Sequence, residues 1–497
     1  MSMHYTVKQK IEQVKNKLLV AVDVGKKELC VKYMNSSRDV YNKKTYRFRN
    51  SSKGLQELLD CTKAMQGTTG YDEAVFGMEP TGHYWLNLAT RLEIIGFTVV
   101  TVNQNHMKNI AEVVDGSQQK SDDKDPEGIG ILVALGDWSP YYRPEGVYAE
   151  IRKAYRLLEK CTEDTTRYTN ELHGYLDKHL PGYESCFGKD KGITSALCLA
   201  VLKKAVLPED ILDLGADGIM KIWKESGLHG MKCRAEKIIS AVRCGQEYAV
   251  IDGAESARLE LTCIIRKLEL AIEMEDSAEK LVRKTVVLIP GAQRLLGIKG
   301  VSYRTVAGFF AIVGDMKKRF TNAKQLVKLA GLNIVIHSSG SHKGEAHISR
   351  RGCPELRTAL YRVLTALLEN TPAFKPIREH YMTRADNPLK PIKANIAMCN
   401  KLLRIFYAMV THDEDFDGEK MLGDIRRMDS TKDSPAVAEA GKLANQLDLI
   451  LNGVKGGGMT GEAVEMIRKI CRAMKGLVAS AERGSVKEAV PPDAAGA

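Results

Sequence analysis

Three strand-like runs followed by alternating helix and strand patterns open the chain, and this order constrains the fold more than any other feature. Residues 18–24 (LLVAVDV) and 28–33 (ELCVKY) are β-rich runs separated by Gly25-Lys26-Lys27, and residues 45–49 (TYRFR) alternate between apolar and polar side chains. These runs predict a meander of three antiparallel strands.

Helical and strand patterns alternate after the meander. A helical stretch at 53–65 precedes a short strand at 73–78, a helix at about 83–95 and a strand at 97–102. Strands that alternate with helices join a sheet in parallel. This order is that of the ribonuclease-H fold, and it predicts an α/β domain over residues 1–145.

The middle of the chain carries helical periodicity without catalytic spacing. Residues 146–290 begin with one long helix that ends near Leu180-Pro181-Gly182, and a second long helical run covers 254–287. No heptad register persists beyond three or four turns. We predict an all-helical arm, of coiled-coil type, that mediates dimerisation.

The last third is predicted to be mainly helical. Four glycines surround a short helix at 295–314, a helix at 324–332 closes at Gly331, and the stretch NIVIHSSGSHKGEAHISRRG is predicted as a polar loop before two further helices. We assign residues 291–410 to one domain. Residues 411–497 are predicted to be a helical extension with a disordered tail.

Basic residues are concentrated in one of these blocks. The chain carries 73 Lys and Arg against 62 Asp and Glu, a net charge of +11. Residues 291–410 hold 20 basic and 6 acidic side chains, or +14, so the other residues sum to −3. A folded block with this surplus favours nucleic acid as a partner, and the alternative is a solvated basic surface.

The composition also restricts the cellular context. No run of eighteen uncharged apolar residues occurs, and the N-terminal segment is polar, which favours a soluble cytoplasmic protein. The eleven cysteines are odd in number and their closest spacing is eleven residues, which argues against a Cys-x-x-Cys zinc site and a secreted disulfide framework.

Acidic residues lie where predicted strands and one helix end. Asp23 closes the first strand, Glu79 follows the strand at 73–78, and Asp122 and Asp125 are three apart in KSDDKDPEG, on one face if that stretch is helical. Four carboxylates that meet at one point suit divalent metal ions, which activate nucleophiles in phosphodiester cleavage.

These acids also allow other interpretations. Asp125 before Pro126 is typical of a helix N-terminus, and Asp122 fits a loop residue. Asp23 before Gly25 also resembles the phosphate loop of actin-like sugar kinases. That interpretation expects a hydroxyl residue soon after the glycine, where this chain has two lysines.

The motifs DVGKKEL, MEPTGHYW and KSDDKDPEG resemble the three acidic motifs of the insertion sequence 110 family of transposases. The resemblance continues in LLGIKGVSYRTVAGFFAIVG and HSSGSHKGEAHISRRGCPELRTALYR, and it covers about 17–140 and 291–410. It implies a RuvC-like first domain and a DNA recombinase of a bacterial or archaeal mobile element that acts on the chromosome.

The resemblance also implies residue roles. Asp23, Glu79, Asp122 and Asp125 would bind Mg²⁺, and Ser339 would attack DNA to form a covalent phosphoserine link. Isoleucine at 334 replaces the proline usual in the family, which leaves the register of the loop open and Ser338 and Ser341 as rival nucleophiles. The predicted nucleic-acid contacts are Lys299, Arg304, Lys343, Arg350, Arg351 and Arg357.

Family membership further implies partners. These are donor and target DNA, a structured guide RNA, and a homodimer or tetramer. Because the acids precede residue 126 and Ser339 follows more than two hundred residues later, we expect a composite site formed between subunits. The alternative function is a RuvC-like junction nuclease in which water attacks and Ser339 is a loop residue.

Overall fold

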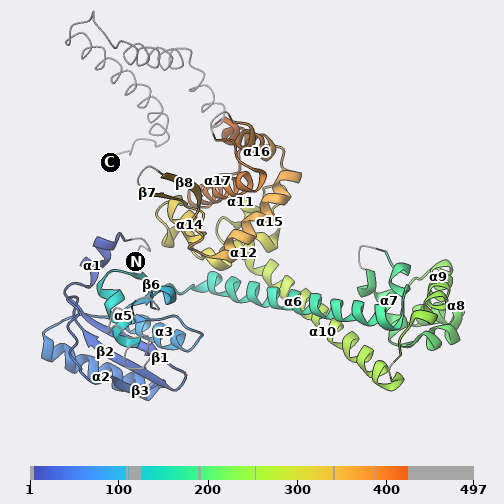
Figure 1. The fold of residues 1–497 in the computed structure, drawn as a ribbon, viewed down its shortest axis with the longest axis horizontal. Coiled ribbons are helices and arrows are strands. Elements are labelled where there is room, and N and C mark those ends of the chain that lie inside the picture. The colour runs from blue at the N-terminus through green and yellow to red at the C-terminus, as the bar shows by residue number, and fades with distance from the viewer. Residues whose placement is uncertain are drawn as a thin grey trace, which may run out of the picture. The chain divides into compact units, whose positions relative to one another are not determined.

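The computed structural model describes residues 5–107, 110, 125–188, 192–251, 253–339, 342–384 and 387–423, with the side chains of 337–345 outside this description. The chain forms two compact units (Figure 1). The first comprises residues 1–292 and 302–326, and the second comprises 293–301 and 327–497. The predicted division into four domains stays a prediction.

A mixed six-stranded sheet lies in the first unit, with the strand order β3-β2-β1-β4-β5-β6. β1 pairs with β2 and β2 with β3 in antiparallel fashion, whereas β4 joins β1 and β5 joins β4 in parallel. The strands are β1 (Leu18–Val24), β2 (Glu28–Met34), β3 (Tyr46–Arg49), β4 (Ala74–Met78), β5 (Thr98–Val102) and β6 (Trp138–Pro140).

The predicted meander and its parallel additions are confirmed. The sequence did not predict β6, an antiparallel edge strand of three residues that ends in a proline. Proline is tolerated in an edge strand, because the N–H group that it lacks is not needed for a hydrogen bond to a further strand. Such a strand is too short to show a period-two pattern.

Alternating side chains of the strands form two cores, one on each face of the sheet. Leu18, Val20 and Val22 pack toward α2 (Ser52–Thr69) and α3 (Trp85–Ile95), whereas the residues between them pack toward α1 (Val7–Val14) and α5 (Asp125–Ala134). Ser51 caps the start of α2, and Gly70 ends it with φ of 78°.

Two long antiparallel helices form the arm, as Figure 1 shows. α6 (Gly146–His179) and α10 (Ala254–Val286) pack along their buried stripes, with Ile151, Leu158 and Leu261 among the buried residues. Three shorter helices pack around Trp223 at one end: α7 (Ala196–Leu202), α8 (Pro208–Glu225) and α9 (Lys232–Gly245). 3₁₀ turns lie at Tyr183–Cys186, Gly192–Thr194 and Gln246–Tyr248.

An ion pair anchors the start of α8 to α10. Asp210 accepts hydrogen bonds from the backbone N–H groups of Val206 and Leu207, at 3.0 and 2.9 Å, and from both terminal nitrogens of Arg258. Burial opposes ionisation of Asp210, but the hydrogen bonds from Arg258 and from the N–H groups of Leu207 and Val206 together outweigh it and lower the pKa of the carboxyl. The predicted helical character of 146–290 is confirmed.

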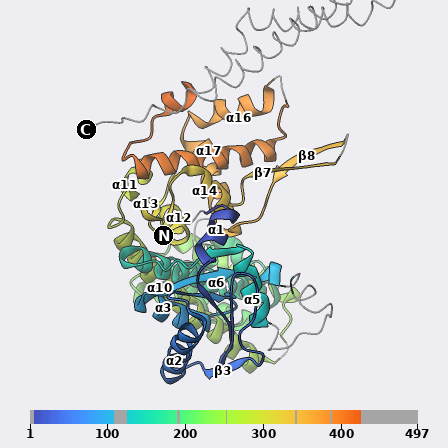
Figure 2. The same ribbon diagram turned by 90° about the vertical axis from the view of Figure 1, so that its left-hand side faces the viewer.

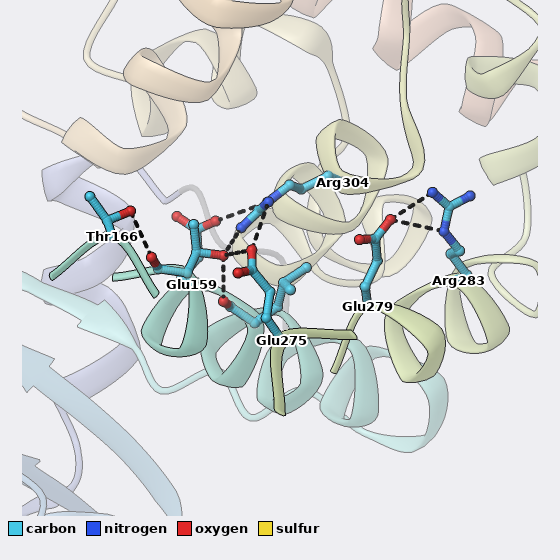
Figure 3. A network of polar contacts seen from close by, with 8 residues as sticks. Glu159, Thr166, Glu275, Glu279, Arg283 and Arg304 are labelled. Atoms are coloured by element: carbon cyan, nitrogen blue, oxygen red, sulfur yellow. Dashed lines mark hydrogen bonds and ion pairs between the residues drawn. The ribbon is translucent and has the colours of Figure 1, made fainter. Parts of the chain in front are cut away.

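The helix after the arm is held to it by an arginine. α12 (Tyr303–Val313) packs on α6 and α10, and the guanidinium of Arg304 lies 3.5 Å from Glu159 and 3.7 Å from Glu275 (Figure 3). Thr162 donates to Glu275 at 2.7 Å and accepts from Arg304. This network and the packing of α12 join the start of residues 302–326 to the arm of the first unit.

The second unit is built on helices α15 (Pro354–Asn370), α16 (Phe374–Thr383) and α17 (Pro391–Thr411), with α15 and α17 in contact through buried side chains. The short helix α11 (Ala292–Leu296) begins at the boundary between the units and α14 (Ala323–Leu329) crosses it, whereas α13 (Met316–Arg319) belongs to the first unit. None of the described helices combines the length and apolarity that crossing a bilayer requires.

The prediction of a polar loop after α14 is wrong. Residues Ile334–Ser339 and His342–Ile348 form the strands β7 and β8 of an antiparallel hairpin, seen side by side in Figure 2. The stretch is rich in serine, glycine and histidine, which do not give the apolar pattern typical of strands. The strands form nevertheless, because their ladder is made by backbone groups that any residue supplies.

Candidate metal centre and nucleophile hairpin

Asp23 and Glu79 lie at the same level on neighbouring parallel strands. Val22 on β1 is the register partner of Met78 on β4, and each acid directly follows one of these residues. Parallel strands lie about 4.8 Å apart. Both acids are half-buried at the carboxyl edge of the sheet.

Both acids continue the side-chain alternation of the face that α5 covers. Ala21 and Val75, which precede Asp23 and Glu79 by two and four residues, belong to the core shared with α5. A Cβ on Gly77 would come within 2.7 Å of Val133, and one on Gly130 within 3.2 Å of the Cβ of Ala21. The two glycines therefore allow α5 to approach the sheet closely.

The turn after β4 orients Glu79. The hydroxyl of Thr81 donates to Glu79 Oε1 at 2.8 Å, and the N–H of Thr81 donates to the carbonyl of Glu79 at 2.9 Å. Gly82 follows with φ of 60°. Thr81 is a positioning residue that sequence reasoning missed, although the Glu-x-Thr-Gly motif contains it.

A side-chain amide links the two acidic loops. Asn50 donates to the carbonyl of Gly25 at 3.0 Å and to that of Tyr84 at 3.5 Å. Gly25 follows Asp23 by two residues, and Tyr84 lies in the segment after Glu79. The bonds therefore fix the β1–β2 turn against the Glu79 loop.

Asp125 is the first residue of α5 and is half-buried, where a negative charge stabilises the helix N-terminus. Asp122 lies outside the described residues, so its predicted convergence with the others is not tested. Within the described ranges, which leave out 111–124, no group of three or more His, Cys, Asp or Glu side chains is close enough to hold a metal ion.

The residues of this edge fit a hard divalent cation. The donors are half-buried carboxylates, and the hydroxyl of Thr81 fixes one of them. Asp23 and Glu79 share one face at one level. Asp122, the fourth predicted ligand, lies outside the described residues.

A polar cavity adjoins the carboxylate edge. It has a volume of about 410 Å³ and is lined by residues of α1, β5, β6 and the Glu79 loop, including Lys10, Pro80, Asn103 and Trp138. Lys10 donates to the carbonyl of Trp138 and lies over its ring. The cavity gathers Lys10, Asp137 and the side-chain amides of Asn103 and Gln104 beside Pro80, the residue after Glu79.

Ser339 is the last residue of β7 and pairs with His342 at the turn of the hairpin. The register shifts between Ile336 and Ser338, so an irregularity precedes the serine. Irregularities of this kind redirect side chains and recur beside active sites. Ser338 pairs with Lys343 one step further from the turn.

The base of the hairpin is fixed to the helices of its unit. Ser349 donates to Asn333 Oδ1 at 2.6 Å, and the N–H of Arg350 donates to the carbonyl of Gly331 at 3.1 Å. A Cβ on Gly352 would meet the backbone of Gly331 at 2.5 Å, so only glycine fits there.

The predicted nucleic-acid contacts occupy different environments. Arg350 and Arg351 are exposed directly after β8, and Lys299 is exposed before α12. Arg357 is half-buried and donates to the carbonyl of Ala330 at 2.9 Å, near the end of α14. Arg304 contacts carboxylates of the arm. Nothing is described of the Lys343 side chain.

Two family models match this chain. Residues 20–181 match a DEDD-type model named for IS110 and described as a transposase, and residues 292–379 match one described as "Transposase IS116/IS110/IS902 family". The chain belongs to the IS110 family of transposases. The resemblance predicted from the sequence is confirmed, and the two matched stretches contain the carboxylate edge and the hairpin.

Two curated relatives of this IS110-family chain also come from insertion elements. The chain is 28% identical over 156 residues to the "Transposase for insertion sequence element IS1111A" of Coxiella burnetii, covering 31% of this chain and 43% of that protein. It is 20% identical over 306 residues to the "Insertion element IS110 uncharacterized 43.6 kDa protein" of Streptomyces coelicolor, covering 61% and 73%. The chain spans less than half of the first relative.

Proposed function

We propose that this protein is the transposase of an insertion sequence, which cleaves and exchanges DNA strands through a serine–DNA intermediate that requires Mg²⁺. The observation that carries the proposal is the juxtaposition of Asp23 and Glu79 on neighbouring strands beneath α5, which begins at Asp125. The family matches supply the context of transposition. We also propose that the sheet domain is RuvC-like, which its strand order supports.

The four predicted acids would share the binding of the metal. Asp23, Glu79, Asp122 and Asp125 would hold Mg²⁺, which when bound lowers the pKa of an attacking hydroxyl and stabilises charge on phosphate oxygens. Thr81 keeps the Glu79 carboxylate in one orientation through its 2.8 Å hydrogen bond. Lys10, which lines a cavity together with Pro80, would contact a phosphate of DNA bound there.

The serine step exchanges one phosphodiester bond for another. The hydroxyl of Ser339 loses its proton and bonds to the scissile phosphorus, while the bond from phosphorus to one DNA oxygen breaks and that oxygen takes up a proton. Attack by a DNA hydroxyl on the phosphoserine link reverses the exchange and joins new ends. Arg350 and Arg351 would hold the phosphate.

Donor DNA, target DNA and a structured guide RNA are the proposed partners. The surplus of +14 over residues 291–410 supports binding of a polyanion. We propose that a homodimer or tetramer presents paired active sites in which the acids and Ser339 come from different subunits. Mixing Asp23→Asn and Ser339→Ala chains should restore part of the activity, and no recovery in mixed oligomers would contradict this.

The test is to trap the covalent adduct. The full chain is incubated with Mg²⁺, labelled element-end DNA and RNA transcribed from the element end, and the products are resolved under denaturing conditions. We expect an adduct with the wild type and with the control variants Ser338→Ala and Ser341→Ala, but none with Ser339→Ala. Cleavage without an adduct in Ser339→Ala would instead favour the junction nuclease that uses water.

A further inference from the structure

The cavity of about 410 Å³ lies at the carboxyl end of β5, and we call it the β5 cavity. Met78 of β4 is the register partner of Thr101 on β5, which puts Glu79 level with Val102. Val102 and Pro80, the residue after Glu79, both line the cavity. Its polar wall includes Lys10, Asn103, Gln104, Asp137, Trp138 and Ser139. The β5 cavity is thus formed at the strand end next to the one that leads to Glu79.

The indole of Trp138 is a buried donor without an acceptor. Trp138 is 3% exposed, and none of the described residues accepts a hydrogen bond from its Nε1. The indole of Trp223 is also buried, but its Nε1 donates to the carbonyl of Leu197 at 2.8 Å. A buried N–H that lacks an acceptor destabilises the protein. Because Trp138 lines a cavity, this donor points to an acceptor that a ligand would bring.

The other polar groups of the wall offer both donors and acceptors. Asn103 uses its side-chain oxygen to accept from the N–H of Asn105 at 2.9 Å, so its amide NH₂ faces the choice of a ligand or water. Asp137 presents a carboxylate that is hydrogen-bonded to Nδ1 of His106. Gln104 is exposed and carries a second amide. Amides and carboxylates are the groups with which proteins recognise the edges of nucleobases.

The cavity has the size of a site for one nucleotide. Pockets for small ligands have volumes of about 300–1,000 Å³, and the β5 cavity falls within this range. A duplex cannot enter it, because the major groove of B-DNA alone is about 12 Å wide. An unpaired base can enter, and enzymes that take up unpaired bases hydrogen-bond the Watson–Crick edge in such pockets. Strand exchange opens base pairs beside the cleaved phosphate and so supplies unpaired bases.

We infer that the β5 cavity binds the base of one unpaired DNA nucleotide beside the scissile phosphate. The N–H of Trp138 and the amide of Asn103 donate to ring nitrogens or carbonyl oxygens of the base. The carboxylate of Asp137 accepts from an exocyclic amino group, so adenine, cytosine or guanine binds better than thymine. Lys10 contacts the phosphate of the same nucleotide. The inference rests on the proposed function, which supplies the DNA strand and its cleaved bond.

Fluorescence of 2-aminopurine tests the uptake of a base. Element-end DNA carries this analogue at successive positions around the cleaved bond, and it is mixed with the full chain and the RNA transcribed from the element end, without divalent metal. We expect the fluorescence to rise at one position, because the base leaves the stack there. The same series with the label in the RNA is the second arm. A rise confined to labelled RNA would overturn the assignment to DNA.

Two variants connect the fluorescence signal to the cavity. Trp138→Phe keeps an aromatic ring and removes the N–H, and Gln104→Ala removes an exposed amide that the fold does not need. Each should weaken uptake of the base by about 2- to 10-fold, the effect of one hydrogen bond. The matched control is Gln56→Ala, since Gln56 is an exposed glutamine of α2 that donates to Asp60 at 3.0 Å. Circular dichroism confirms that each variant folds.

An abasic nucleotide at the responsive position tests whether the base itself is bound. The ratio of the dissociation constants of abasic and intact DNA should be about 10-fold larger for the wild type than for the Trp138→Phe, Gln104→Ala double variant. The variant has already lost the contacts that the abasic nucleotide removes. Equal ratios in the two proteins would show that the base is bound elsewhere and would overturn the inference.

The outcomes separate this inference from the proposed chemistry, because neither measurement needs Mg²⁺ or cleavage. A chain that takes up the base but forms no serine adduct would contradict the proposed chemistry and support the cavity. A chain that forms the adduct without a fluorescence rise at any position would overturn the cavity alone. A rise that is as large in Trp138→Phe and Gln104→Ala as in Gln56→Ala would also overturn it.

Discussion

The carboxylate edge and the nucleophile hairpin are supported in opposite ways. Asp23 and Glu79 extend from central strands that α5 covers so closely that glycine is required at 77 and 130. Ser339 lies at the end of a two-stranded ribbon, where Ile334 and Ile336 are 70 and 57% exposed. One region is positioned by its core, whereas the other is fixed mainly at its base.

This difference implies that the carboxylate edge is ordered before substrate binds, whereas the hairpin with Ser339 is not fully supported until then. Carboxylates on packed strands are oriented in the free protein and need little reorganisation to take a metal. An isolated two-stranded hairpin is only marginally stable by itself. We expect nucleic acid or a second subunit to complete the support of the hairpin, and each substitution below tests one side of this contrast.

The largest effect is expected from Asp23→Asn. Loss of one carboxylate from the metal set should reduce strand cleavage by at least about 10³-fold, while binding of DNA and RNA changes little because the basic surface is intact. Single-turnover cleavage and a filter-binding titration measure the two quantities. Equal losses in both would mean that Asp23 supports the fold and not the chemistry.

A smaller effect is expected from Thr81→Val, which removes the hydrogen bond to Glu79 and keeps the shape of the side chain. Loss of a group that orients a metal ligand typically costs 10- to 100-fold in metal affinity or activity. The dependence of cleavage on Mg²⁺ concentration should shift upward by about that factor. Thr68→Val on α2, whose hydroxyl donates to Ala64, is the control and should cause no shift.

The carboxylate edge could be predicted from the sequence in more detail than the hairpin. β1 and β4 are short, nearly continuous apolar runs that end at or just before an acid, so these strands and the places of Asp23 and Glu79 could be predicted. The hydrogen bond from Thr81 could not, because it depends on the turn that Gly82 allows. The Asp122 and Ser339 roles stay predictions.

The hairpin shows why a strand can be missed. Ile334 and Ile336 alternate before the serines, and Ala346 and Ile348 alternate after them and are their register partners. This alternation predicts a hairpin, but the polar stretch between the strands suggested a loop. Strand pairing is a long-range property that a local reading of polarity does not detect.

Close packing of α5 on the sheet predicts a stability effect for Gly77→Ala. The new Cβ would lie 2.7 Å from Val133, and overpacking of this kind costs roughly 1–3 kcal/mol of unfolding free energy. Gly67→Ala is the matched control, because nothing lies within 4 Å of its Cβ and alanine is the better helix former. Denaturant unfolding should therefore show opposite signs for the two variants.

The smallest effect on stability is expected in the hairpin. Ile336→Ser removes an apolar side chain that is already 57% exposed, and surface substitutions usually stay within about 0.5 kcal/mol. Denaturant unfolding of the free protein should not separate this variant from the wild type. Adduct formation should nevertheless fall if a bound partner covers the apolar face of the hairpin in the active assembly. A loss of more than about 1 kcal/mol in the free protein would show that the hairpin is packed before binding, and the contrast with the carboxylate edge would then fail.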